Sequence, residues 1–176
     1  HLNLSILCKN IGINKFRIEK IEEIRHNRTR KHYKIKEKTT MENCIFCKII
    51  GGEIPSNTIY EDDEFKVILD ASPASKGHAL ILPKEHYADI YEIDEKTAGH
   101  AMQLAKKLAK HMTDVLKCDG FNIVQNNHEI AGQTVFHFHM HLIPRYKNAK
   151  NNDILIWDHE EFTPEEMAEI RDSLKM

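Results

Sequence analysis

The 176-residue chain lacks any long apolar segment, since no run approaches the ~18 residues that a membrane-spanning helix needs. The first forty residues also lack the apolar core and small-residue cleavage site of a signal peptide. Cysteine is scarce, and the spacing of the four present is not that of a secreted disulfide framework: Cys8, Cys44, Cys47 and Cys118. We therefore expect a cytoplasmic protein with no membrane association.

Net charge is also small, at −2, but it is unevenly distributed. Residues 1–40 hold 11 Lys and Arg against 4 Asp and Glu, whereas residues 41–176 hold 14 against 23. The acidic body argues against general nucleic-acid binding, which needs a basic face. We expect residues 1–40 to be a basic extension that is non-native or disordered. The alternative is a true arm that contacts RNA or another polyanion.

Internal repeats are absent, and strands do not alternate with helices as in βαβ units, so we expect an α+β fold with an antiparallel sheet. Apolar patterns predict about five strands, at 58–60, 65–69, 78–82, 121–125 and 134–143. Helical periodicity predicts a long helix at 95–117, capped by Asp94, and a capping box at Thr163 predicts a helix from Pro164 to about Leu174. The expected domain is 41–146, followed by a linker and helix over 147–176.

Histidine, in contrast, is abundant, with twelve residues. Three of them, His137, His139 and His141, alternate with apolar residues. In a strand this spacing places all three imidazoles on one face and the apolar residues on the core face. One chemistry for such a face is a three-histidine metal site. The other is a nucleophilic histidine that attacks phosphorus, supported by a second histidine two residues away.

Cys44 and Cys47 have the spacing of metal ligands, but a second such pair is missing, which excludes a zinc ribbon. A redox pair would normally follow a strand in a βαβ unit, and here almost nothing globular precedes Cys44. Two further ligands could come from the histidines, and free thiols are the alternative.

The segment from His137 to Ile143 resembles the signature of the histidine triad (HIT) superfamily, in which three histidines alternate with apolar residues. The resemblance covers about residues 42–146, and its ordered motifs look most like the zinc-containing, bacterial Hint-like branch. Those motifs are Cys44 to Ile50, Asp70 before Ser72-Pro73, Gly77 to His86, Asn126, and Gly132 to Val135. The resemblance implies a homodimer whose sheets meet around the long helices.

The family pattern also implies roles for individual residues. His139 matches the nucleophile, and His141 matches the partner that contacts the α-phosphate. Gln133 and Thr134 match catalytic positions that face the phosphate and the leaving group. The expected nucleotide-binding residues are Asp70 at the ribose hydroxyls, His78, Asn126, Gly132 and Val135. Ile59, Phe65 and Leu69 are candidates for the wall of the base pocket, although they could equally belong to the core.

In the zinc-bearing relatives, the remaining two metal ligands correspond to His86 and His137. The resemblance therefore implies a closed, structural Cys₂His₂ zinc site with Cys44 and Cys47, and it leaves His139 and His141 free for phosphorus chemistry. No catalytic metal is expected.

The implied function is cleavage of a purine nucleoside 5′-phosphoramidate, or a related nucleoside 5′-phosphate derivative, through a nucleotidyl-histidine. One alternative is a hydrolase of dinucleoside polyphosphates such as diadenosine tetraphosphate, because Pro144-Arg145 after the triad also occurs in that branch. The other is a nucleotide-binding regulatory or scaffold protein.

Overall fold

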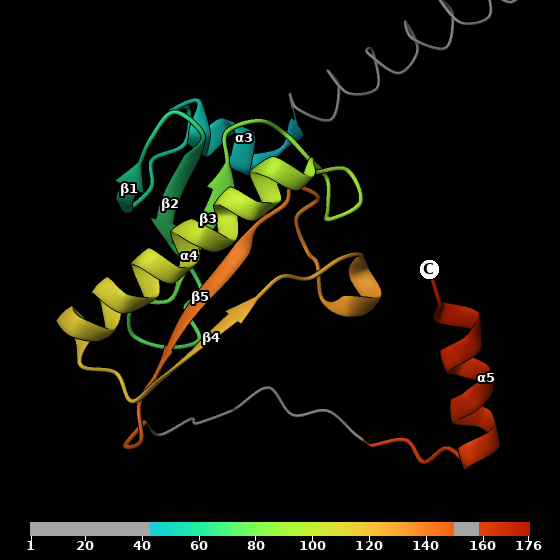
Figure 1. Ribbon diagram of the computed structural model, residues 1–176. Coiled ribbons are helices and arrows are strands. Elements are labelled where there is room, and N and C mark those ends of the chain that lie inside the picture. The colour runs from blue at the N-terminus through green and yellow to red at the C-terminus, as the bar shows by residue number, and fades with distance from the viewer. Residues whose placement is uncertain (1–42, 150–158) are drawn as a thin grey trace, which may run out of the picture.

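The computed structural model describes residues 43–149 and 159–176 (Figure 1). The predictions for the basic segment 1–40 lie outside this part of the chain. The elements, in chain order, are α3 (Ile45–Ile50), β1 (Thr58–Glu61), β2 (Phe65–Leu69), β3 (Ala79–Pro83), α4 (Glu95–Leu116), β4 (Gly120–Val124), the 3-10 turn η2 (Glu129–Ala131), β5 (Met140–Arg145) and α5 (Pro164–Leu174).

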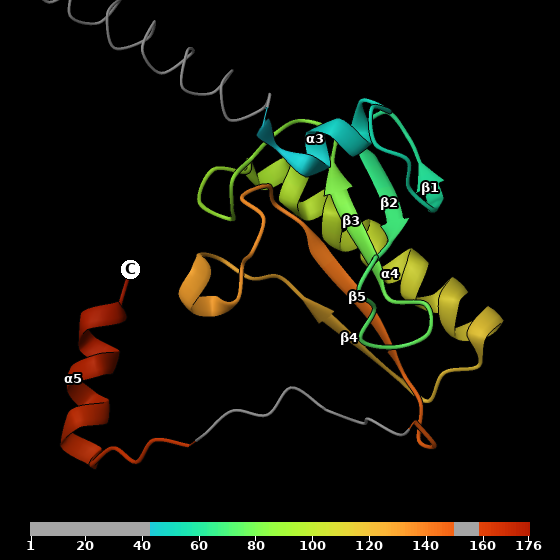
Figure 2. The same ribbon diagram turned by 180° about the vertical axis from the view of Figure 1, so that it is seen from behind.

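The five strands form one antiparallel sheet in the order β1-β2-β3-β5-β4. This confirms the predicted α+β class, the antiparallel sheet and its number of strands. The long helix α4 lies across one face of the sheet, and the short helix α3 lies on the opposite side, as the two views in Figures 1 and 2 show. Strand β5, the last of these five in the sequence, sits between β3 and β4.

Alternation along the strands divides the core into two clusters. Phe65 and Val67 of β2, with Phe138 and Met140, pack beneath α4. On the other side of the sheet, Ile68 of β2 and two leucines of β3 pack against Phe46 and Ile49 of α3. Because the side-chain period of a strand is two, one sheet supports both layers.

The predicted long helix is confirmed almost to the residue, and its chemistry explains why. Asp94 is the N-cap, and its side chain accepts a hydrogen bond from the Thr97 backbone N–H. The buried residues of α4 recur at intervals of three or four positions, as expected for one face of a helix: Thr97, Ala101, Leu104, Ala105, Leu108 and Met112. The C-terminal helix is likewise confirmed, with both hydrogen bonds of the capping box between Thr163 and Glu166 present.

The prediction of one strand over 134–143 is wrong in its first half, since β5 begins at Met140. The backbone before it makes other bonds: Phe138 N–H donates to the Tyr87 carbonyl at 2.6 Å, and His137 N–H donates to the Val135 carbonyl at 2.9 Å. These bonds bend the chain away from the sheet ladder. The alternation of side chains nevertheless continues through the bend, because Phe138 is buried in the same cluster as Met140.

Among the described residues, no helix combines the length and apolar character that crossing a membrane requires.

Candidate active site and metal centre

His139 lies just before β5, on the side of the sheet that faces α3. It is 5% exposed, and its ring packs at 5.2 Å against the ring of Phe46. Its Nδ1 lies 2.6 Å from the His137 carbonyl oxygen, which can only accept, so Nδ1 carries the proton. The Nε2 atom of the neutral ring is then an unprotonated nucleophile. Burial, foremost, lowers the pKa of His139 and keeps the ring neutral.

A second hydrogen-bonded chain fixes the opposite tautomer of His141. The backbone N–H of Ala74 donates to Nδ1 of His78 at 3.0 Å, so the proton of neutral His78 must be on Nε2. That Nε2–H lies 2.9 Å from Nδ1 of His141. His141 therefore accepts through Nδ1 and carries its own proton on Nε2, as a donor. Burial, followed by the neighbouring His139 and His78, lowers the pKa of His141 to about 4.

Asp70 stands beside this histidine pair. Its Oδ1 accepts the Ser72 backbone N–H at 2.8 Å, while Oδ2 lies 3.6 Å from His78 Nε2 and 4.0 Å from His141 Nδ1. Asp70, His78 and His141 each have one possible metal-ligand atom, and these atoms lie close enough together to hold a cation. A metal, however, would need a lone pair on His78 Nε2, and the Ala74 N–H directs the proton to that atom. The cluster is thus built for hydrogen bonding.

His139 lines a pocket of about 330 Å³ between α3 and the sheet. Its apolar wall consists of Ile45, Phe46, Ile49, Ile68, Leu69, Leu80 and Val135. Asp70, Thr134, His139 and His141 supply polar groups. Of the three residues predicted to line a base pocket, Leu69 does so, Phe65 is buried in the core beneath α4, and Ile59 lines a separate groove.

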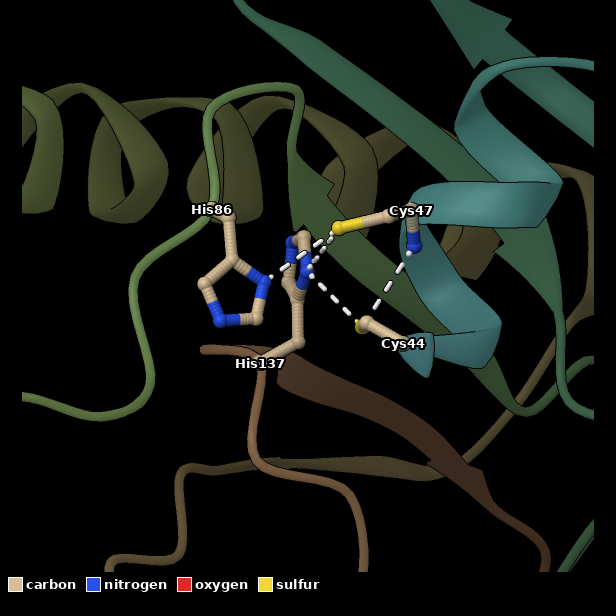
Figure 3. A group of neighbouring side chains, drawn as sticks. All are labelled: Cys44, Cys47, His86 and His137. Atoms are coloured by element: carbon tan, nitrogen blue, oxygen red, sulfur yellow. Dashed lines mark hydrogen bonds between the residues drawn. The ribbon is translucent and has the colours of Figure 1, made fainter. Parts of the chain in front are cut away.

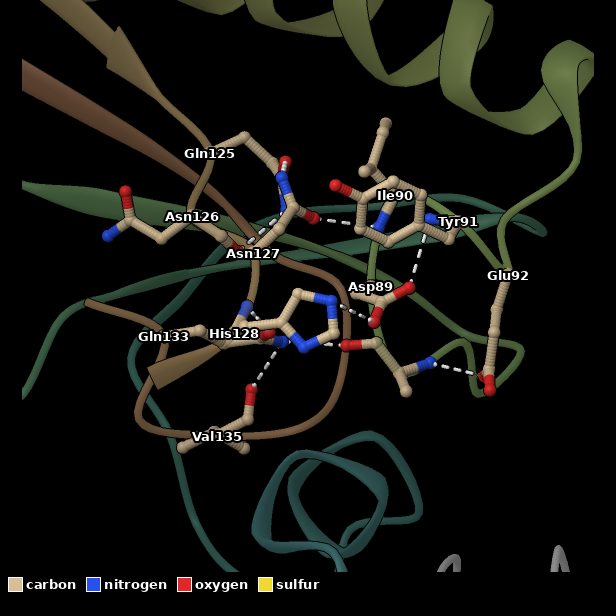
Figure 4. Close-up of polar contacts among 11 residues, drawn as sticks. Asp89, Ile90, Tyr91, Glu92, Gln125, Asn126, Asn127, His128, Gln133 and Val135 are labelled. Carbon is tan, nitrogen blue, oxygen red and sulfur yellow. Dashed lines mark hydrogen bonds and ion pairs between the residues drawn. The ribbon is translucent and has the colours of Figure 1, made fainter. Parts of the chain in front are cut away.

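Gln133 lies between η2 and β5, and its side chain contacts backbone groups of the protein, whereas the family pattern implied that it faces the phosphate and the leaving group. It is 1% exposed, and its Nε2 donates to the carbonyls of Ala88 at 2.7 Å and Val135 at 3.1 Å. Its Oε1 accepts the His128 backbone N–H at 2.8 Å (Figure 4). These three bonds hold the loop together, whereas Thr134, the next residue, lines the pocket.

The other two predicted residues of this loop interact with each other. Asn126 Nδ2 donates to the Gly132 carbonyl at 3.5 Å. Gly132 has a φ of 87°, and a Cβ at that position would lie 3.4 Å from Asn126 Nδ2. The left-handed backbone favours glycine at this position.

Cys44, Cys47, His86 and His137 converge from three segments of the chain (Figure 3). Nδ1 of His137 lies 3.5 Å from both thiol sulfurs, and Nδ1 of His86 lies 3.2 Å from Sγ of Cys47. A tetrahedral zinc with ordinary Zn–S and Zn–N bonds would separate sulfur and nitrogen by about 3.6 Å. Nε2–H of His137 also donates to the Pro83 carbonyl at 2.9 Å, which leaves Nδ1 as the ligand atom.

The two thiols of this group differ in acidity. Burial by itself raises the pKa of both thiols, but the neighbouring His137 and His86 side chains outweigh it at Cys44 and bring that pKa to about 5. At Cys47, burial and the neighbouring Cys44 raise the pKa to about 12. A divalent cation bound between the two sulfurs would favour the thiolate form of both cysteines.

Comparison with known proteins agrees with this geometry. Residues 51–148 match the HIT domain. The chain belongs to the HIT family. A crystal structure of a HIT-family member from Bacillus subtilis has a TM-score of 0.70 and 40% sequence identity, over 75% of this chain and 94% of that one.

Two further HIT relatives carry informative names. The Saccharomyces cerevisiae protein named adenosine 5′-monophosphoramidase HNT1 is 41% identical over 131 residues, which is 74% of this chain and 80% of the relative. A zinc-bound histidine triad family protein from Mycobacterium smegmatis has a TM-score of 0.60 and 31% identity, over 76% of this chain and 99% of that one.

Sequence reasoning missed three contributors to this HIT site. Helix α3 was not predicted, although Phe46 and Ile49 form one wall of the pocket. The apolar spacing within the Cys44 segment was the available signal, but six residues are too few for periodicity to decide. Neither the Ala74 N–H, which fixes the tautomer of His78, nor the Pro83 carbonyl, which fixes that of His137, has a signature in sequence.

Proposed function

We propose that this HIT protein hydrolyses purine nucleoside 5′-phosphoramidates, or related nucleoside 5′-phosphate derivatives, to nucleoside monophosphates through a covalent intermediate on His139. One observation carries the proposal: His139 has an unprotonated Nε2 and lines a pocket that also has an apolar wall. The activity in the name of the yeast relative supports the same substrate class.

The pocket suggests how the substrate binds. The purine would lie against the apolar wall formed by α3 and β2, where it gains from burial without base-specific hydrogen bonds. Asp70 would accept from the ribose hydroxyls. The phosphate would then lie between His139 and Thr134, within reach of the Nε2–H of His141.

The reaction follows from the two tautomers. Nε2 of His139 attacks the α-phosphorus while its Nδ1–H stays bonded to the His137 carbonyl, which stabilises the positive charge that develops on the ring. The P–N bond breaks, and the nitrogen leaves as an amine with a proton supplied by solvent. Nε2–H of His141 donates to a phosphoryl oxygen throughout. Water then cleaves the nucleotidyl-histidine and releases the monophosphate.

The direct test is a product assay with adenosine 5′-phosphoramidate and diadenosine tetraphosphate in parallel. We expect AMP from the phosphoramidate, and a loss of at least ~10³-fold in kcat/KM in His139→Ala, because the nucleophile has no substitute. His111→Ala, an exposed histidine of α4, is the matched control and should retain full activity.

Other outcomes of this assay would favour the alternatives. Preferential cleavage of the dinucleotide would indicate a dinucleoside polyphosphate hydrolase. AMP binding without turnover of either compound would indicate a regulatory or scaffold protein. Equal activity of wild type and His139→Ala would contradict the covalent mechanism.

We also propose a structural zinc ion held by Cys44, Cys47, His86 and His137. The donor set fits, because the sulfur–nitrogen distances match those across a tetrahedral ion and the Pro83 carbonyl orients one ligand. The named zinc-bound relative supports it. With four protein ligands, the ion would stabilise the fold and leave phosphorus chemistry to His139.

Metal analysis of the purified chain tests this proposal. We expect about one zinc per chain in wild type and a large loss in Cys44→Ser, together with a lower melting temperature. Cys118→Ser is the control, since Cys118 is buried elsewhere and should retain the metal. A stable wild-type protein that binds no zinc would rule the site out.

For the protein as a whole, we propose a homodimer that works in the cytoplasm, with the catalytic domain at 41–146 and a linker and helix at 147–176. Cys44 and Cys47 form no disulfide, and two reduced cysteines that act as metal ligands are consistent with a reducing compartment. Binding of nucleic acid or membrane is not part of the proposed function.

A further inference from the structure

The side chain of Gln133 is buried in the segment between η2 and β5, and every polar group of its amide has a backbone partner. Nε2 donates to the carbonyls of Ala88 and Val135, and Oε1 accepts the His128 N–H (Figure 4). A primary amide has two N–H donors and one carbonyl oxygen, so all three groups are in use. With 1% of the residue exposed, Gln133 has no free surface for a substrate. The amide therefore acts on the backbone around it.

The segment that Gln133 supports lies outside the sheet. Residues 134–139 precede β5, and buried backbone groups that have no ladder partner need other hydrogen bonds. Three hydrogen bonds join this segment and Gln133 to residues 83–88, and the Gln133 side chain makes one of them. They run from Gln133 Nε2 to the Ala88 carbonyl at 2.7 Å, from Phe138 N–H to the Tyr87 carbonyl at 2.6 Å, and from His137 Nε2 to the Pro83 carbonyl at 2.9 Å.

The second donor of Gln133 connects the amide to His139. The Val135 carbonyl accepts Nε2–H of Gln133 at 3.1 Å and the backbone N–H of His137 at 2.9 Å, so the amide braces this turn. The His137 carbonyl in turn lies 2.6 Å from Nδ1 of His139. Thr134, which lies between Gln133 and Val135, lines the same pocket as His139. A shift of the turn would therefore move two polar groups of the pocket together.

We propose that Gln133 is a positioning residue that aligns His139 and Thr134 through the turn at Val135. The inference rests on the proposed phosphoramidase function. Attack on phosphorus requires close alignment of Nε2 of His139, and a misplacement of about 1 Å can lower the rate by about 10²-fold. This role differs from the direct contact with the phosphate and the leaving group that the family pattern implied for Gln133.

Two substitutions of nearly equal size test the hydrogen bonds of Gln133 without a large change in volume. Gln133→Glu keeps an acceptor but loses at least one of the two donors, whereas Gln133→Met loses all three groups. With adenosine 5′-phosphoramidate, we expect kcat to fall by roughly 10-fold in the first variant and roughly 10²-fold in the second. The Kd of AMP should change little, because the purine and ribose would contact α3, β2 and Asp70.

A milder substitution covers the case in which these two variants fail to fold. Gln133→Asn retains the amide on a side chain that is one methylene shorter, so it cannot keep all three hydrogen bonds at once. We expect a folded protein whose kcat is lower by roughly 10-fold and whose affinity for AMP is close to that of wild type.

Two controls separate positioning from a general loss of stability. Met112→Ala removes a buried side chain of the core beneath α4, so it should lower the melting temperature but keep the wild-type kcat well below that temperature. Asn127→Ala removes the hydrogen bond that Asn127 Oδ1 accepts from the Ile90 N–H at 2.8 Å, between the same two parts of the chain. It should also keep the wild-type kcat. A fall in kcat confined to the Gln133 variants would then come from alignment.

The outcomes are distinct. If wild type hydrolyses the phosphoramidate and the Gln133 variants keep its kcat, the positioning role is wrong and the proposed function stands. An equal loss of kcat in Met112→Ala, an equal loss of AMP affinity in the Gln133 variants, or failure of even Gln133→Asn to fold would also overturn the positioning role. If wild type hydrolyses no phosphoramidate, the proposed function fails and the positioning role fails with it.

Discussion

His139 and His141 show how two identical side chains, two residues apart, acquire different chemistry. The His137 carbonyl holds the proton of His139 on Nδ1, whereas His78 donates to Nδ1 of His141 and so leaves its proton on Nε2. One ring offers a lone pair and the other offers a donor. The alternating sequence pattern identified both residues but could not distinguish the tautomers, which depend on backbone groups from other segments.

The lowered pKa of His141 predicts a dependence of stability on pH. The folded-state pKa is about 4, below the ordinary value of 6.5, so the unfolded chain takes up a proton between these values that the folded chain does not. The contribution of neutral His141 to the free energy of unfolding is therefore complete above pH 6.5 and is lost as the pH falls from 6.5 toward 4. The free energy of unfolding of wild type should decrease between pH 7 and pH 5. Allowing for the partial exposure of His141, we expect this decrease to be smaller by about 1 kcal/mol in His141→Gln.

Urea unfolding of both proteins at the two pH values measures this difference. His111→Gln, on the exposed face of α4, should keep the wild-type dependence. A His141→Gln protein with an undiminished loss of stability would show that His141 does not titrate in this way.

At the scale of elements, prediction succeeded where a segment carries its own signal. Helix α4 has a cap, a period and a length that agree with one another, and α5 has its capping box. Residues 134–139 carried a conflicting signal, since their alternation suits a strand while their backbone bonds to Tyr87 and Val135 instead. Such bonds depend on tertiary contacts, so no local pattern could reveal them.

The loop between β2 and β3 approaches the end of α4 closely. Alanine substitutions at two glycines, one in this loop and one in α4, test this close approach. Gly77 has a φ of 86°, and a Cβ there would lie 2.5 Å from Cδ1 of Leu116. We expect Gly77→Ala to destabilise the fold by about 1–2 kcal/mol. Gly99 lies within α4 with no atom within 4 Å of its would-be Cβ, so Gly99→Ala should stabilise by up to about 1 kcal/mol.

Chemical denaturation of the two variants beside wild type provides the measurement. Opposite signs for the same substitution would confirm that the close approach of Gly77 to α4, and its backbone conformation, are native features. Equal and small effects would mean that this loop adapts freely.

At the scale of the whole molecule, the site is assembled from distant parts of the chain. Cys44 and His137 are separated by 93 positions, and the histidine chain joins residues separated by 63. The order of motifs gave the family and, with it, the pairing of Cys44 with His137, but not that of His78 with His141. Spacing alone could not have given them, because contacts across such separations leave no periodic trace in a single sequence.

Exposed apolar side chains on α4 and the unpaired edge of β4 support the proposed homodimer. Met102 and Val115 on α4 are 52% and 63% exposed, and β4 ends the sheet with an edge that can pair further. Sedimentation at micromolar concentration should give about twice the chain mass of 20.5 kDa. A mass that stays at 20.5 kDa over the whole concentration range would refute the dimer.

The strand order has a consequence for synthesis. β5 is made last of the five strands, yet it fills the middle of the sheet between β3 and β4. Until residues 140–145 leave the ribosome, β3 has an open edge and β4 has no neighbour at all, so the nascent chain must delay folding while exposing two sites for mispairing. Because His139 and His141 arrive with that same strand, the proposed catalytic residues and closure of the sheet come within a few codons of each other. A message truncated before this point would yield neither an enzyme nor a stable fragment.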